Sequence, residues 1–148
     1  LDIRSLAQHT IEDLAGAVNG SRFNLIAPDD LPLVLGDKDR QTQILTNLLS
    51  NAIKFSLPKE PIGVELSFAG DFVQVSVTDR GIGIAKSDQT KLFQKSGRVI
   101  YSTNQKKPGN GLGLHICRTL VEAQGGRIWC KSIVGQGSTF SYTIPVMP

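Results

Sequence analysis

Four runs of alternating apolar and polar residues constrain the fold of this chain most strongly, because they fall into two pairs. The runs are residues 63–68 and 72–78, which flank Ala69-Gly70-Asp71, and residues 127–132 and 139–144, which flank Gly135-Gln136-Gly137. A period of two predicts a strand, and a short glycine-containing turn between two strands predicts a hairpin. We therefore expect two hairpins in one sheet.

Helical periodicity predicts the layer that covers this sheet. Apolar residues recur at helical spacing in residues 3–19, 37–55 and 112–124, with stop signals at Gly20, Ser56-Leu57-Pro58 and Gly125-Gly126. We also expect a strand at 22–26, a turn at 79–83 and, within the polar region 84–110, a short helix near 89–93. The order predicts an α+β fold, a two-layer α/β sandwich with about three helices on one face of a mixed, mostly antiparallel sheet of about five strands. The strict strand–helix alternation of a doubly wound fold is absent.

Size and composition indicate one domain. The chain has 148 residues, 40% of them hydrophobic and 20% charged, which suffices for a single core. No apolar run approaches the roughly 18 residues that cross a bilayer. Cys117 and Cys130 have no metal-ligand spacing, so neither a disulfide framework nor a zinc site is expected. We expect a reducing, cytoplasmic compartment and, because the chain starts at Leu1, a fragment of a longer protein with or without a membrane anchor elsewhere.

The positive charge is concentrated in one region. The chain carries a net charge of +3, and no carboxylate occurs between Asp88 and Glu122. The basic residues there are Lys91, Lys95, Arg98, Lys106, Lys107 and Arg118. Such a region attracts an anion, although a solvated basic face is the simpler interpretation. Stacking aromatic residues are missing from it apart from Tyr101, so nucleic acid is not an expected partner.

The segment "QTQILTNLLSNAIKF" predicts a helix with one polar face. Gln43, Asn47, Asn51 and Lys54 share a stripe roughly 80° wide, and Leu45, Leu48, Leu49, Ala52 and Ile53 lie opposite. An asparagine oxygen is a suitable ligand for Mg²⁺, and a lysine can meet a phosphate as a point charge. An ordinary polar surface is the alternative.

Two glycine-rich segments suggest a nucleotide site. In "VTDRGIGI", Asp79 ends an apolar strand ahead of Gly81 and Gly83, so it is either a turn former or a carboxylate that accepts a hydrogen bond from an exocyclic amino group, as adenine has. In "PGNGLGLHI", residues 108–116, glycines precede a helix whose N-terminus would favour a phosphate. The spacing matches neither a P-loop nor a dinucleotide-binding motif.

Taken in order, these segments resemble the N, G1, F, G2 and terminal glycine boxes of one family. They are "NLLSNAIKFS", "DRGIGI", "KLFQKSGRV", "GNGLGL" and "GQGSTF". The chain resembles the ATP-binding catalytic domain of sensor histidine kinases, within the wider GHKL group of gyrase B, Hsp90 and MutL, which has the Bergerat fold. The resemblance covers residues 1–148 as a single domain.

The resemblance implies ATP and Mg²⁺ as cofactors and assigns roles to individual residues. It implies Asn51 as the Mg²⁺ ligand, Asn47 beside the metal or a phosphate, Lys54 near the phosphates, Asp79 on the adenine amino group, and Gly81 and Gly83 beside the ring. It further implies Phe93 in the aromatic position, Lys95 and Arg98 at the β and γ phosphates, and Gly109, Asn110, Gly111, Leu112, Gly113 and Thr139 in contact with the nucleotide. Asn51, Lys54 and Arg98 would contribute to catalysis, and residues 96–108 would form an ATP lid.

Departures from the family pattern concern the lid and the phosphate acceptor. Ser96-Gly97 stands where a second aromatic residue is common, and Asn110 stands in place of a threonine. The family's phosphorylated histidine lies on a separate dimerisation domain, and neither His9, which precedes Thr10, nor His115 fits that role. The resemblance therefore implies γ-phosphoryl transfer to a histidine of another domain of the same protein, with a response regulator receiver domain as a further partner. We expect a homodimeric full protein, no membrane contact by this domain, and a monomeric fragment that does not autophosphorylate.

Two other functions stay open at this point. A serine kinase of the same ATP-binding group, of the anti-sigma-factor type, shares most of these boxes. A degenerate module that binds only nucleotide or a partner protein is the second. A gyrase-type or Hsp90-type ATPase is disfavoured, because the segment Gln41-Thr42-Gln43-Ile44 lacks the glutamate that the resemblance implies as the base for water.

Overall fold

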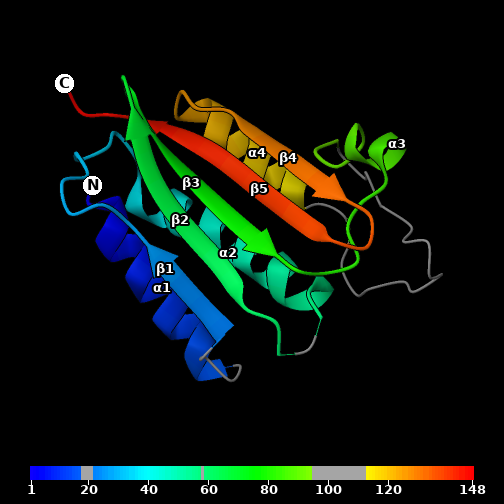
Figure 1. Ribbon diagram of the computed structural model, residues 1–148. Coiled ribbons are helices and arrows are strands. Elements are labelled where there is room, and N and C mark those ends of the chain that lie inside the picture. The colour runs from blue at the N-terminus through cyan, green and yellow to red at the C-terminus, as the bar shows by residue number, and fades with distance from the viewer. Residues whose placement is uncertain (18–21, 58, 95–112) are drawn as a thin grey trace.

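A computed structural model of the chain describes residues 1–17, 22–57, 59–94 and 113–148. The helices and strands are α1 (Ile3–Ala17), β1 (Phe23–Ile26), α2 (Lys38–Phe55), β2 (Ile62–Ala69), β3 (Phe72–Asp79), α3 (Lys86–Gln89), α4 (Gly113–Ala123), β4 (Ile128–Ile133) and β5 (Gly137–Pro145). Figure 1 shows one twisted sheet with α1, α2 and α4 against the same face and α3 beyond the end of β4. The predicted fold class, including the mixed sheet of five strands, is confirmed.

The sheet has the order β1-β2-β3-β5-β4. Both predicted hairpins are present as the antiparallel pairs β2–β3 and β4–β5, and β3 joins them by pairing antiparallel with β5. β1 pairs parallel with β2, starting at Phe23 opposite Ile62. The central position of β3 and β5 puts the ends of these two strands next to each other, with Asp79 directly opposite Ser138.

Helix α2 occupies the middle of the helical layer and contacts both α1 and α4. It begins after Asp37, whose carboxylate accepts a hydrogen bond from the backbone N–H of Arg40 at 2.9 Å and so caps the helix. Its buried face consists of Gln41, Ile44, Leu45, Leu48, Leu49 and Ala52. Of the polar stripe predicted from the sequence, Gln43 and Lys54 are exposed, whereas Asn47 and Asn51 are half-buried.

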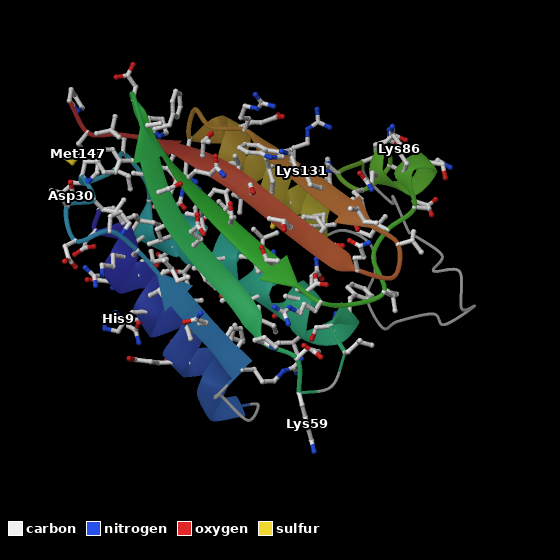
Figure 2. All side chains as sticks on the ribbon, viewed as in Figure 1. His9, Asp30, Lys59, Lys86, Lys131 and Met147 are labelled. Atoms are coloured by element: carbon white, nitrogen blue, oxygen red, sulfur yellow. The ribbon has the colours of Figure 1, made fainter. Side chains whose placement is uncertain are left out.

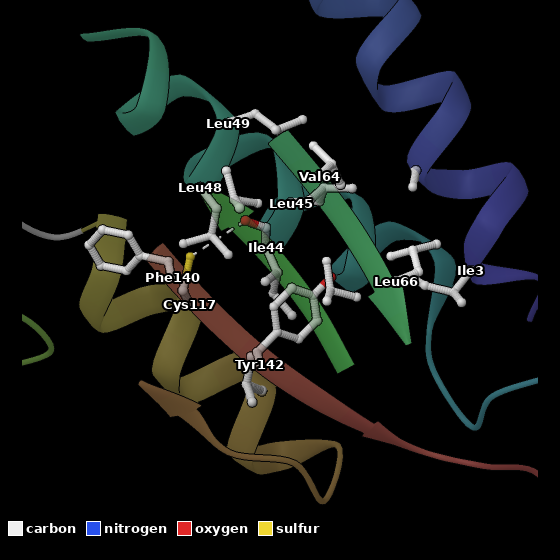
Figure 3. Close-up of a cluster of buried hydrophobic side chains, with 14 of the residues drawn as sticks. Ile3, Ile44, Leu45, Leu48, Leu49, Val64, Leu66, Cys117, Phe140 and Tyr142 are labelled. Atoms are coloured by element: carbon white, nitrogen blue, oxygen red, sulfur yellow. Dashed lines mark hydrogen bonds between the residues drawn. The ribbon is translucent and has the colours of Figure 1, made fainter. Parts of the chain in front are cut away.

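The core lies between the helices and one face of the sheet. Val73, Val75 and Val77 of β3 are at most 1% exposed, as the period of two predicts. Figure 3 shows Phe140 and Tyr142 of β5 with Cys117 of α4 beside the leucines and Ile44 of α2. Both cysteine thiols are free. No helix in the described ranges is long and apolar enough to cross a bilayer.

The short helix differs from the prediction. It lies at Lys86–Gln89 instead of 89–93, because the carbonyl of Ala85 accepts from the N–H groups of both Asp88 and Gln89 and starts the helix earlier. After Gln89 the backbone continues with bonds between residues three apart, such as Leu92 N–H to the Gln89 carbonyl. These are turns, so the α-helix ends before the predicted segment is complete.

Candidate functional site

A pocket opens at the end of the sheet where β3 ends and β5 begins, beside α2 and α4. It is lined by Asn51, Phe55, Asp79, Ile82, Gly83, Ile84, Leu114, Ser138 and Phe140. Most of these side chains are apolar, and the polar ones come from three different elements. A concave apolar site with a few convergent polar groups is the usual form of a small-molecule site.

Asp79 is the buried carboxylate of this pocket. Asp79 is only 6% exposed, and the backbone N–H of Gly81 donates a hydrogen bond to its Oδ1 at 3.0 Å. Burial raises its pKa to about 6, although the hydrogen bond from Gly81 acts in the opposite direction. Burial and the nearby Asp79 charge together raise the pKa of the Cys130 thiol to about 12. An ionised carboxylate here can only accept hydrogen bonds, so it suits a ligand that donates one.

The loop after β3 is held tightly by the backbone on both sides. A Cβ atom on Gly81 would lie 1.9 Å from the carbonyl oxygen of Phe55, and one on Gly83 would lie 2.2 Å from that of Ile133. Gly83 also has a φ of +73°, which favours glycine. These two glycines are therefore required by chain packing whether or not a flat ring lies beside them.

The two asparagines of α2 face the pocket and α4. Asn51 lines the pocket, and both asparagines are half-buried. A Cβ on Gly113, the first residue of α4, would lie 4.0 Å from the side-chain amide of Asn47. Lys54 is exposed at the C-terminal end of the same helix. The N-terminus of α4 and the polar stripe of α2 thus lie next to each other, as the predicted phosphate site requires.

Phe93 contacts the wall of the pocket. Its ring meets that of Phe140 edge to face, with 6.2 Å between the centroids and 80° between the planes. Its carbonyl oxygen lies 3.3 Å from Nδ1 of His115 on α4. His115 therefore has a structural contact with the segment that holds Phe93.

Thr139 does not join the pocket. Successive residues of a strand point to opposite faces, so Thr139 lies on the face without helices, where its hydroxyl pairs with that of Thr78 at 3.0 Å. Ser138, one residue earlier, lines the pocket in its place. Ser138 shares its strand face with Phe140, so the alternation of the strand indicates which of the two residues faces the pocket.

The remaining predicted site residues fall outside the described residues. They are Lys95, Arg98, Gly109, Asn110, Gly111, Leu112 and the proposed lid, 96–108.

The donor groups of the pocket fit a metal ion held mainly by a ligand. Among the described residues, no group of three or more His, Cys, Asp or Glu side chains could hold a metal ion. Asn51 contributes one amide oxygen to the pocket. Mg²⁺ usually keeps several waters and takes its other ligands from one or two protein oxygens and substrate phosphates, so a sparse donor set of this kind is suitable.

Comparison with known proteins gives both a family match and whole-domain structural similarity. The sequence model of the family described as "Histidine kinase-, DNA gyrase B-, and HSP90-like ATPase" matches residues 36–148. The chain is 42% identical over 144 residues to the adaptive-response sensory kinase SasA of Synechococcus sp. (strain JA-2-3B'a(2-13)), an alignment that covers 95% of this chain and 38% of that protein. The chain thus spans well under half the length of this relative.

Solved structures share the fold over the whole chain. The mycobacterial sensor histidine kinase MprB superposes with a TM-score of 0.87 at 24% identity, covering 100% of this chain and 98% of that one. Full-length ShkA, solved in complex with AMPPNP, superposes with a TM-score of 0.79 at 27% identity, covering 99% of this chain and 31% of that one.

Proposed function

Because the chain belongs to the family of histidine kinase-, DNA gyrase B- and HSP90-like ATPases, we propose that it binds Mg-ATP and delivers the γ-phosphoryl group to a histidine on another domain of a sensor kinase. The observation that carries the proposal is Asp79, a buried carboxylate in an apolar pocket. The apolar side chains that line the pocket can pack against a purine ring, and the carboxylate can accept a hydrogen bond from the exocyclic amino group of adenine.

The triphosphate extends from the base towards α2 and α4. The first backbone N–H groups of a helix have no intrahelical partners, so those at the N-terminus of α4, near Gly113, can bind an anion. Asn51 and Asn47 offer amide oxygens beside them. These would hold Mg²⁺ together with the phosphates, and the ion would supply charge neutralisation. Lys54, Lys95 and Arg98 are proposed to contact the phosphates. Phosphoryl transfer depends mainly on such positioning and charge neutralisation, so no covalent role is required of this chain.

The nucleophile comes from outside this domain. His9 lies on α1, which packs at the β1 edge of the sandwich (Figure 2). The pocket instead lies beside α2 and α4, where β3 ends and β5 begins. His115 is half-buried, and its Nδ1 lies within hydrogen-bond distance of the Phe93 carbonyl oxygen. SasA is named as a sensory kinase and MprB as a sensor histidine kinase. ShkA was solved in complex with AMPPNP. We propose that the phosphoryl group is accepted by a histidine on a dimerisation domain of the same protein. A receiver domain of a response regulator then accepts it from that histidine.

Calorimetric titration with ATP tests the first half of this function. We expect binding that depends on Mg²⁺ and is abolished in Asp79→Asn, because an amide at this position offers a donor where the base also donates. Asp71→Asn is the matched control, since Asp71 lies exposed in the β2–β3 turn. If the folded chain does not bind ATP, the proposal is wrong and the chain is a degenerate module that binds a partner protein.

Transfer of labelled phosphate tests the second half. The full kinase, or this chain mixed with its histidine-bearing domain, is expected to form a phosphoprotein whose label is lost in acid, because a phosphorus–nitrogen bond is acid-labile. The chain alone is expected to stay unlabelled. An acid-stable label would instead indicate the serine kinase alternative.

A further inference from the structure

The hydroxyl group of Ser132 connects the loop after β3 to the strand that carries Ser138. Ser132 lies on β4, and the backbone N–H of Ile84 donates to its Oγ at 2.7 Å. The same oxygen lies 3.0 Å from the carbonyl oxygen of Gly137 and 2.7 Å from Oγ of Ser138. One half-buried hydroxyl therefore contacts both sides of the pocket entrance, and none of its contacts is with a charged group.

The direction of each hydrogen bond follows from what the partners can do. A serine hydroxyl has one hydrogen to donate and two lone pairs that accept. The Ile84 N–H can only donate and the Gly137 carbonyl can only accept, so the Ser132 hydrogen goes to Gly137. Either hydroxyl can donate in the bond between the two serines, and we assign the donor to Ser138 because all three contacts are then hydrogen bonds. Ser138 is left with lone pairs alone towards the pocket that it lines.

This orientation matters because Ser138 is the direct cross-strand neighbour of Asp79. The ionised Asp79 carboxylate is also a pure acceptor, so the polar edge of the pocket presents two acceptors side by side. We propose that Ser132 is a positioning residue that fixes the Ser138 hydroxyl as an acceptor and thereby strengthens the preference of the site for a 6-amino purine over a 6-oxo purine. The proposal rests on the proposed function of this pocket as an adenine nucleotide site.

The loop after β3 is held by further hydrogen bonds, so the orientation of the Ser138 hydroxyl can change without unfolding the loop. Gln89 donates through Nε2 to the carbonyls of Ile84 at 2.9 Å and Ser132 at 3.0 Å. The N–H of Gly135 donates to the Ile82 carbonyl at 2.8 Å. None of these bonds uses the Ser132 hydroxyl. Its removal is therefore expected to free the Ser138 hydroxyl to rotate while the loop stays in place.

Titration of ATP and inosine triphosphate into the chain and its variants tests the proposal, because inosine carries a carbonyl oxygen where adenine carries the amino group. The unaltered chain is expected to prefer ATP. In Ser132→Ala the freed Ser138 hydroxyl can donate to that carbonyl, so the ratio of ATP to inosine triphosphate affinities is expected to fall about tenfold. Ser132→Thr keeps a hydroxyl and is expected to retain the preference.

Ser76→Ala removes a half-buried hydroxyl that lies 2.8 Å from Oγ of Ser141 on the opposite face of the sheet, and it is expected to leave the ratio unchanged. Thermal unfolding reports whether each variant folds, and Ser132→Cys, with a weak hydrogen-bonding thiol of similar size, replaces the alanine variant if that does not fold. A folded variant that loses affinity for both nucleotides equally, or for neither, overturns the proposal. An unaltered chain that binds neither nucleotide overturns the proposed function as well.

Discussion

Asp79 is held in a site that disfavours its charge, although an acceptor is needed there for the proposed contact with adenine. Its carboxylate is buried among apolar side chains, and backbone hydrogen bonding, chiefly from the N–H of Gly81, compensates for part of the lost hydration. Burial of the carboxylate costs free energy in the unliganded chain. A ligand that donates a hydrogen bond to the carboxylate recovers part of that free energy, which favours its binding. Functional sites commonly contain groups whose pKa is displaced in this way.

The stability of the chain is expected to depend on pH through Asp79. Its pKa is raised from 3.8 to about 6 in the folded chain, so the folded state binds the proton more tightly than the unfolded state and stability falls as pH rises from about 4 to 6. Asp79→Asn removes this penalty. Its free energy of unfolding should exceed that of the unaltered chain by roughly 1 to 3 kcal/mol at pH 7, and the difference should shrink towards pH 4.

Urea unfolding of both proteins at several pH values measures this difference. Asp71→Asn, which changes an exposed carboxylate, provides the comparison. A gap between Asp79→Asn and the unaltered chain that stays constant from pH 4 to 7 would mean that Asp79 titrates normally.

Individual site residues could be predicted where a local sequence pattern indicated them. Asp79 was identified because it ends an apolar strand ahead of glycines, and Asn51 because it lies on the polar stripe of a helix. Thr139 was assigned by resemblance alone, and the alternation of β5 puts Ser138 into the pocket instead. The contact of Ser132 with Ile84 joins two segments that are distant in sequence, so no local pattern could have indicated it, whereas its contacts with Gly137 and Ser138 lie within one hairpin.

At the scale of elements, the β4–β5 hairpin shapes the loop after β3, and the N-terminus of α4 faces α2. The two glycine-rich segments differ in what surrounds them. Gly83 is packed against the backbone of the hairpin, with no space for a side chain. Gly113 has only ordinary contact distances around a Cβ, the nearest being 4.0 Å, so its glycine is not explained by packing among the described residues.

Alanine substitutions of these two glycines are expected to have opposite effects. Gly83→Ala introduces a contact of 2.2 Å with the Ile133 carbonyl at a positive φ, so we expect a loss of about 3 kcal/mol or more in the free energy of unfolding. Gly113→Ala should leave stability unchanged or raise it by up to about 1 kcal/mol, because alanine is the better helix former. If the backbone there must approach a phosphate, the same change lowers ATP affinity about tenfold or more.

Thermal unfolding and calorimetric titration of the two variants separate these effects. A Gly113→Ala variant with full ATP affinity would remove the N-terminus of α4 from the proposed phosphate site. A Gly83→Ala variant as stable as the unaltered chain would mean that the loop can move away from the hairpin.

The elements themselves were predictable because each has a clear period. Both hairpins and the three long helices follow from apolar spacing, and the helix stops at residue 55 and after residue 123 coincide with Ser56-Leu57-Pro58 and Gly125-Gly126 within one or two residues. The parallel pairing of β1 with β2 was not indicated by any pattern, because it joins strands separated by the whole of α2. The position of α3 was missed because its segment has only four helical residues and no apolar period.

At the scale of the whole molecule, the pocket is assembled from parts that only the complete sandwich brings together. Asn51 comes from α2, Asp79 from β3, Leu114 from α4 and Ser138 from β5. A ligand that contacts all four elements binds the folded chain and not the unfolded one, so its binding must raise the stability of the whole domain. The magnitude is about 2.7 kcal/mol when the ligand is present at 100 times its dissociation constant.

The same linkage predicts how divalent metal affects the domain. Because the described residues contain no cluster of His, Cys, Asp or Glu side chains that could hold a metal ion, Mg²⁺ is expected to bind only together with the triphosphate. A chelator should therefore leave the melting temperature of the nucleotide-free chain unchanged, and should abolish most of the increase that ATP produces. Thermal unfolding with and without ATP, each in Mg²⁺ and in chelator, measures these four conditions, with Asp79→Asn as the variant in which ATP should have no effect. A nucleotide-free chain destabilised by the chelator would instead point to a metal ion bound by the protein itself, and hence to ligands beyond Asn51.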